Sequence, residues 1–187
     1  MKTIILSILL IGIITTSCSA QKKIAALSDN VITKAKLETY MIKKEKQKVT
    51  IENSNNKFAN IKQSSPNLPI NISLRPYYIK LDIQELTKIC AKHINTNDLE
   101  TLADVKYAGI SIDLRTNTNG KVLEISFFTD GNSILSLQQI EGIEYDIKTS
   151  NIVNIKPEAE KYLKNSNFVL VDTAIYFDDI LKVKKAL

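Results

Sequence analysis

The chain has little of several residue types that common catalytic and binding motifs require. It holds no tryptophan, one histidine, two cysteines and five glycines in 187 residues. So few glycines argue against a glycine-rich phosphate loop, and no serine lies in the G-x-S-x-G pattern of a nucleophile elbow. One histidine and two cysteines cannot complete a structural zinc site without carboxylates. We therefore expect neither a cofactor nor a metal, and we expect a protein that is not an enzyme.

A signal for export occupies the first twenty residues. The apolar run Ile4 to Ile14 has the length of a signal-peptide core and is too short to span a bilayer. Ser17 and Cys18 follow it, which resembles a bacterial lipobox, although Thr15 stands where Leu is commonest. Cleavage before Cys18 gives a lipoprotein that is acylated on this cysteine, whereas cleavage after Ala20 gives a soluble periplasmic protein. We predict lipidation, because a cysteine at this place has no role in the second alternative.

The residue after Cys18 predicts the destination. Ser19 stands there and not Asp, which resembles lipoproteins that are forwarded to the outer membrane. We therefore expect a chain anchored in membrane lipid through acyl chains on Cys18 and facing the periplasm. Once Cys18 is acylated or removed, Cys90 has no partner within the chain, so the core must be stable without a disulfide.

The positive net charge is concentrated near the N-terminus. Residues 21–62 hold 10 lysines and 4 acidic residues, a net charge of +6, whereas residues 63–187 hold 14 basic and 16 acidic residues, a net charge of −2. A basic segment beside a lipid anchor is attracted to anionic headgroups, although a solvated lysine-rich tail has the same composition. Because the rest of the chain is slightly acidic, we expect no nucleic-acid partner.

The composition predicts that the chain has three parts. Residues 1–17 are the signal peptide, residues 18–69 a lipid-anchored tether rich in Lys and Asn, and residues 70–187 a folded domain. Within the tether, Leu27 to Lys48 has an irregular apolar stripe that weakly indicates a helix, and Val49 to Ile51 can form a short strand. Glu52 to Pro69 is rich in Asn and Ser and has little to bury, as in a linker.

The clearest structural signal is a hairpin around Asn119-Gly120, the sequence typical of a two-residue type I′ turn. Such a turn fixes the register, so that the numbers of any two residues facing each other across the hairpin add up to 239. Ile112 then faces Phe127, and Asp113 faces Ser126, with apolar residues on one side of the hairpin and polar residues on the other. We predict its strands over residues 108–116 and 121–129.

The remaining segments predict an α+β fold. Asp82 and Ser136 each precede an amphipathic helix and can cap it. The order from Ile70 is β-α-β-β-α-β, which predicts a single antiparallel or mixed sheet with helices on one face. The expected elements are strands 70–74, 152–155 and 168–177, the last of them central in the sheet, helices 82–94, 99–105, 137–147 and 158–164, and a frayed basic end at 182–187.

The run from Ile110 to Phe128, with Asn-Gly-Lys-Val leading into Leu-Glu-Ile, is similar to the hairpin of TonB C-terminal-like domains. The helix from about Leu137 follows it at the same place. The resemblance covers about 40 residues and implies a small α+β domain that recognises proteins, often by adding a strand to an exposed edge. The chain lacks the inner-membrane helix of that family and its Tyr-Pro sequence before the hairpin, so the resemblance transfers no site residue.

Few side chains are candidates for chemistry. Cys90 and His93 are three residues apart and can meet on one helix face, but Cys90 lies on the apolar stripe, where a buried thiol is inert. Asp172, Asp178 and Asp179 do not have the spacing of a calcium loop and are typical of a solvated turn. We therefore predict no catalytic, cofactor-binding or metal residue.

Arg75, Tyr77 and Tyr78 form the best candidate for an interaction surface, because Arg and Tyr are favoured at interfaces. The sequence thus favours a non-enzymatic outer-membrane lipoprotein that binds a protein or an envelope component. Two alternatives remain. One is a periplasmic hydrolase or transferase whose site has no motif, and the other is a small inhibitor or immunity lipoprotein.

Overall fold

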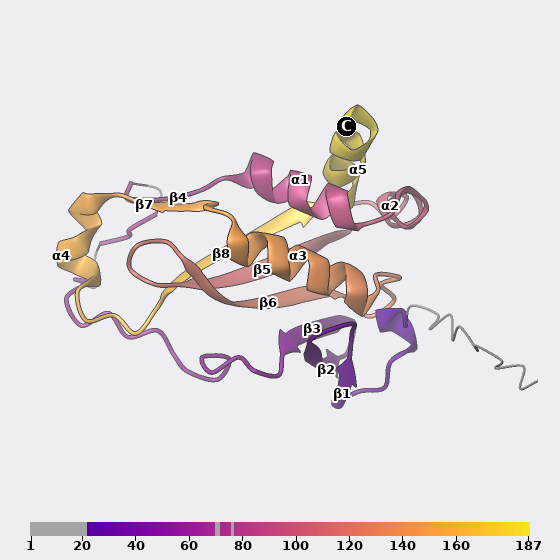
Figure 1. Cartoon of the computed structure of the whole chain (residues 1–187), viewed down its shortest axis with the longest axis horizontal. Helices are drawn as coiled ribbons and strands as arrows, with labels where there is room; N and C mark the ends of the chain where they lie inside the picture. The colour runs from indigo at the N-terminus through magenta and orange to yellow at the C-terminus, as the bar shows by residue number, and fades with distance from the viewer. Residues whose placement is uncertain (1–21, 70–71, 76) are drawn as a thin grey trace, which may run out of the picture.

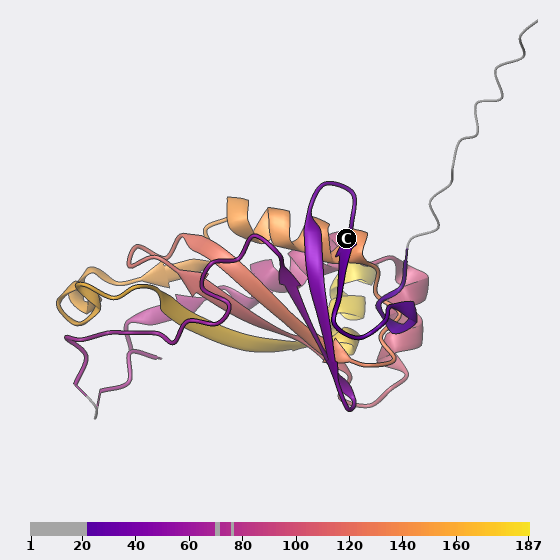
Figure 2. The same cartoon turned by 90° about the horizontal axis from the view of Figure 1, so that it is seen from below.

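The protein has two layers, a sheet and the helices that cover one of its faces (Figures 1 and 2). The computed structural model describes residues 22–69, 72–75 and 77–187. Six antiparallel strands are arranged in the order β1-β2-β3-β6-β5-β8, and β4 pairs with β7 in a separate two-stranded sheet. The predicted α+β class is confirmed, although the strands form two sheets. The strands are β1 Val31–Lys34, β2 Thr39–Glu45, β3 Lys48–Asn53, β4 Ile79–Leu81, β5 Gly109–Thr116, β6 Val122–Asp130, β7 Val153–Ile155 and β8 Val169–Tyr176.

The helices connect these strands and pack mainly against one another and the core face of the sheet. The α-helices are α1 Ile83–His93, α2 Thr96–Ala103, α3 Leu137–Thr149, α4 Glu160–Leu163 and α5 Phe177–Ala186, and the short 3₁₀ turns are η1 Ile24–Ala26 and η2 Pro157–Ala159. Asp82 caps α1 by accepting from the Glu85 N–H, and Ser136 with Gln139 forms a complete capping box on α3, as predicted.

The β5–β6 hairpin has the predicted register. Ile112 lies opposite Phe127 and Asp113 opposite Ser126. Ile112 and Phe127 are fully buried in the core beneath the helices. The alternation of apolar and polar residues therefore determined which side of this hairpin faces the core.

The turn of this hairpin differs from the prediction. The Gly120 N–H donates to the Asn117 carbonyl at 3.0 Å, and Gly120 has φ +86°, whereas Asn119 has no positive φ. The register shifts between Arg115 and Thr116. A four-residue turn with a bulge thus replaces the type I′ turn. The bulge is the register shift between Arg115 and Thr116, which accommodates the longer turn without changing the pairing of the rest of the hairpin.

Strands β1 and β2 replace the helix expected at residues 27–48, whereas the short strand expected at residues 49–51 is confirmed as part of β3. Tyr40, Ile42, Val49 and Ile51 are fully buried and alternate with more exposed residues, which is the period of a half-buried strand. β3 pairs with β6, so β1 to β3 belong to the same sheet as the strands that follow residue 69. The boundary expected at residue 69 therefore lies within a single sheet-forming unit.

Three smaller expectations also need correction. Ile72 to Leu74 has no strand, and the rest of the segment expected as a strand, Ile70 and Asn71, lies outside the described residues. β8 is an edge strand and not a central one, since only β5 pairs with it and Leu170 is 39 % exposed. The basic end is not frayed but completes α5, whose Phe177 and Ile180 are buried.

Candidate functional site

The face of the sheet opposite the helices is polar, and we call it the open face because no helix of the described chain covers it. The strand registers place four of its side chains in one row. Glu52 lies opposite Ser126, Ser126 opposite Asp113, and Asp113 opposite Asp172, which runs across β3, β6, β5 and β8. We call these four residues the acidic row. Opposite residues of neighbouring strands share a face, so their side chains can interact directly.

The half of the acidic row nearest β3 is internally satisfied. The Ser126 hydroxyl donates to Glu52 Oε1 at 2.9 Å, and Arg115 Nη1 donates to Ser126 Oγ at 2.8 Å. Lys43 Nζ lies 3.7 Å from Glu52 Oε2. Glu52 is only 8 % exposed, so this carboxylate is held by a cation and a hydroxyl, as a buried charge requires.

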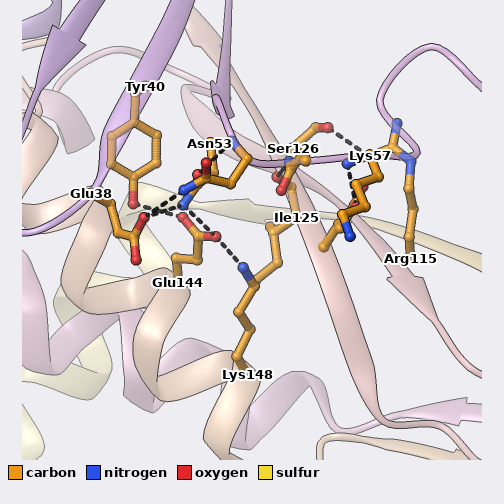
Figure 3. Close-up of polar contacts among 12 residues, drawn as sticks. Glu38, Tyr40, Asn53, Lys57, Arg115, Ile125, Ser126, Glu144 and Lys148 are labelled. Atoms are coloured by element: carbon orange, nitrogen blue, oxygen red, sulfur yellow. Dashed lines mark hydrogen bonds and ion pairs between the residues drawn. The ribbon is translucent and has the colours of Figure 1, made fainter.

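A segment that the sequence presented as a linker crosses one end of the open face. We call residues 54–69 the strap. The Glu124 carboxylate accepts from the backbone N–H groups of Lys57 and Phe58 at 2.5 and 2.8 Å, and Arg115 Nη2 donates to the Ala59 carbonyl at 3.4 Å (Figure 3). Phe58 packs on Phe168, with ring centroids 5.3 Å apart. The strap is therefore fixed next to the acidic row.

The half of the acidic row nearest β8 lacks such partners. The Asp113 carboxylate accepts no hydrogen bond from any residue that the structure describes. Burial raises the pKa of the Asp113 carboxyl. The nearby carboxylates of Asp172 and Glu52 raise this pKa further, whereas the positive charges of Arg115 and Lys48 lower it. The Asp172 side chain is 72 % exposed, and its partner is Arg75, whose Nη1 lies 3.3 Å from Asp172 Oδ1.

The outer edge of β8 is covered over only its first half. Gln63 Oε1 accepts from the Leu170 N–H at 2.9 Å, and Arg75 Nη1 donates to the Asp172 carbonyl at 2.8 Å. These contacts show that the backbone groups of even-numbered β8 residues point away from β5. Ala174 therefore also points outward, and its N–H and C=O have no hydrogen-bond partner among the described residues.

The three predicted interaction residues have different surroundings. Arg75 lies against β8 and pairs with Asp172. Tyr77 is 70 % exposed, whereas Tyr78 packs on Tyr162, with ring centroids 5.8 Å apart. Cys18, the predicted lipidation site, lies outside the described residues. Arg75 is thus the one predicted residue that borders the open face.

Cys90 and His93 do not act together in this structure. Cys90 is fully buried, and burial raises the pKa of its thiol to about 12. His93 Nε2 lies 2.8 Å from Asp146 Oδ2. Its ring packs where a Cβ at Gly142 would lie, only 2.3 Å from His93 Nδ1. Gly142, which weakens the helical pattern of α3, therefore makes room for the imidazole between α1 and α3.

A second polar cluster joins the first strands to α3. The Tyr40 hydroxyl donates to Glu144 Oε2 at 2.6 Å, and Lys148 Nζ donates to Glu144 Oε1 at 2.5 Å (Figure 3). Burial, reinforced by the Glu144 carboxylate, raises the pKa of the Tyr40 hydroxyl, so that it remains a donor. Because Glu144 is buried and each of its oxygens has a partner, we interpret this cluster as structural.

A groove of about 970 Å³ lies where β6 ends and β5 begins. Its charged lining has both signs, with Lys46, Lys48 and Lys106 opposed by Glu45 and Asp130. In the described part of the chain, no group of three or more His, Cys, Asp or Glu side chains could hold a metal ion. Within the same residues, no helix combines the length and apolarity that a membrane span needs.

The fold is similar to that of a solved structure. A DUF5043 family protein from Bacteroides uniformis ATCC 8492 matches 79 % of this chain over 85 % of its own, with 16 % sequence identity and a TM-score of 0.64. At this identity the likeness shows the fold alone. No family model and no curated protein matches the chain. None of these comparisons supports the expected resemblance to TonB C-terminal-like domains.

The sequence did not indicate the acidic row. The hairpin rule placed Asp113 opposite Ser126, and that signal was available from the start. The other two members come from β3 and β8, whose pairing with the hairpin has no local signature. A search for chemical motifs misses such a row, because its members are far apart in the chain.

Proposed function

We propose that this protein is a non-catalytic binding module that captures an extended segment of a partner protein on the free half of the β8 edge. The observation that carries this proposal is the outward-facing backbone of Ala174, which lacks a hydrogen-bond partner among the described residues. An added strand would supply those bonds and extend the six-stranded sheet.

The edge is well suited to such an addition. An unprotected edge strand is a template for pairing with another chain, so soluble proteins usually cover it. Here Gln63 binds the Leu170 N–H and Arg75 binds the Asp172 carbonyl, whereas the backbone of Ala174 has no such partner among the described residues.

We also propose that the module is a lipoprotein, acylated on Cys18 and held at the periplasmic face of the outer membrane. The support is the apolar run Ile4 to Ile14 followed by Ser17 and Cys18. Intact mass of the membrane-fraction protein tests this for wild type and Cys18→Ala. Added acyl mass that the variant loses, together with membrane association, is the expected result. An unmodified chain that starts at Gln21 in the soluble periplasm would reject it.

The strand-addition proposal is tested by Ala174→Pro. Proline is tolerated on an edge strand where its missing N–H faced outward, so the fold should persist. The probe is a ten-residue peptide in which Thr alternates with Lys and Val, TKTVTKTVTK. We expect titration calorimetry or fluorescence anisotropy to show binding to wild type and to Ala174→Ser, which keeps the N–H, and at least about tenfold weaker binding to Ala174→Pro. Equal affinity for the proline and serine variants would reject edge pairing.

A further inference from the structure

The free half of the β8 edge lies beside an unbalanced pair of carboxylates. Asp113 and Asp172 are directly opposite on neighbouring strands. Like charges in this position destabilise a sheet. The outward direction of the Asp172 backbone makes this a non-hydrogen-bonded pair, in which the two side chains approach most closely.

The cations near this pair have other contacts. Arg115 donates to Ser126 and to the strap at Ala59, and Lys48 Nζ lies 4.2 Å from the centre of the Phe128 ring. Lys43 lies next to Glu52. Arg75 is the one cation in ion-pair contact with Asp172 among the described residues. Its shorter contact, 2.8 Å, is to the Asp172 backbone carbonyl and not to the carboxylate. Asp113 has no cation in hydrogen-bond contact.

A strand that is added beside β8 and reaches Asp172 would take the place of Arg75 at the Asp172 carbonyl, so its own residue opposite Asp172 would have to supply the cation. Its residue opposite Asp172 shares the open face, with Cβ atoms about 5 Å apart, and a Lys or Arg side chain is long enough to reach past Asp172 to Asp113. The next open-face position lies opposite Ala174, whose methyl group, with Ser111 behind it, leaves room for a larger side chain.

We propose that the segment captured at β8 is basic, with a Lys or Arg that faces Asp172 and Asp113 and a larger apolar side chain two residues away over Ala174. This inference rests on the strand-addition function proposed above. The two positions alternate along one strand and fit either strand direction.

A second copy of this chain does not meet the requirement. The open-face residues of β8 are Leu170, Asp172, Ala174 and Tyr176, none of which is basic. Antiparallel self-pairing centred on Ala174 would place Asp172 opposite Tyr176 and leave the carboxylate pair without a cation. Charge complementarity therefore favours a different protein as the partner.

The test compares TKTVTKTVTK with a matched peptide in which Glu replaces each Lys. We expect only the Lys peptide to bind wild type and its affinity to fall as salt rises. Asp172→Asn and Asp113→Asn should each weaken binding roughly two- to fivefold, as for exposed charge pairs. Glu158→Gln serves as the control. It removes one exposed carboxylate on η2, so it changes the net charge as much as each Asp→Asn variant does, and it should not change binding.

Each outcome separates the two proposals. The basic partner would be overturned if the Lys and Glu peptides bound equally, or if Asp172→Asn and Asp113→Asn did not change binding. Edge pairing would still stand in that case, provided that Ala174→Pro loses binding. Failure of both peptides to bind wild type, or full binding to Ala174→Pro, would overturn edge pairing and the basic partner with it. Circular dichroism of each variant establishes that the fold is retained.

Discussion

At the scale of single residues, the polar side chains of this protein differ in how well their charges are balanced. Glu52 has a hydroxyl and a lysine beside it, whereas the Asp113 carboxylate accepts no hydrogen bond within the described residues. A carboxylate that folding leaves partly desolvated and next to a like charge lowers stability. Natural sequences retain such positions where function benefits, which is consistent with a binding role for the acidic row.

Asp113→Asn should therefore stabilise the protein at neutral pH. The pKa of Asp113 is raised in the folded state, so the unfolded chain loses its proton at lower pH, and stability is lost as pH rises from the unfolded pKa through the folded one. We expect a gain of up to about 1 kcal/mol at pH 7, which vanishes below about pH 3.5. Urea unfolding at a series of pH values measures it, and a variant less stable than wild type at pH 7 would contradict it.

Cys90 should be unreactive in the folded protein. Its pKa of about 12 leaves very little thiolate at pH 8, and its side chain is fully buried. In a Cys18→Ala chain, where Cys90 is the sole thiol, alkylation by iodoacetamide should be at least about a thousandfold slower than in urea. Fast labelling of the native protein would mean that this part of α1 opens frequently.

At the scale of elements, short-range chemistry determined helices and the central hairpin well. Capping by Asp82 and Ser136 is encoded within four residues, and alternation over β5 and β6 determined their register. β1 and β2 were missed because they derive their stability from the sheet that β3 joins by pairing with β6 and from contact with α3, neither of which is visible within a local window.

The hairpin turn depends on Gly120. It has φ +86°, and an added Cβ would lie 2.3 Å from the Val153 carbonyl oxygen. Gly120→Ala should therefore destabilise the protein by about 2 kcal/mol, combining backbone strain with displacement of β7. Thermal unfolding measures the loss, and Lys121→Ala next to it, which removes only an exposed side chain, serves as the control.

The contact between α3 and the first strands depends on Glu144. Removing this buried carboxylate leaves the Tyr40 hydroxyl without its acceptor and takes one of two acceptors from the Asn53 amide, which keeps Glu38. Glu144→Ala should cost about 3 kcal/mol, and Tyr40→Phe, which removes one donor, should cost less. Hydrogen exchange should show the loss first at the amides of β2 and β3. A uniform change over all strands would show that the cluster stabilises the molecule as a whole.

At the scale of the whole molecule, the N-terminal third of the described chain completes the core. Tyr40, Ile42, Val49 and Ile51 are all fully buried, and β3 pairs along β6. The strap then returns the chain across the open face to β4. Residues 22–69 are thus integral to the sheet, whatever the segment before them does.

A fragment of residues 70–187 should consequently fail to fold. Without β1 to β3, β6 becomes an unprotected edge and apolar residues such as Ile125 and Phe127 lose cover. We expect aggregation or a loss of far-ultraviolet dichroism, whereas residues 22–187 should give a monomeric, cooperatively unfolding protein. A fragment that unfolds cooperatively on its own would restore the domain boundary at residue 69.

The sequence by itself determined what depends on neighbours in the chain: the α+β class, the caps of α1 and α3, the pairing of Ile112 with Phe127 and the burial of Cys90. Only the tertiary structure decided that residues 31–34 and 39–45 are strands, that β8 is an edge and that Glu52, Ser126, Asp113 and Asp172 form a row. The physical reason is that pairing between distant strands is selected by the burial of a shared face. That free energy belongs to the assembled sheet and to no single segment.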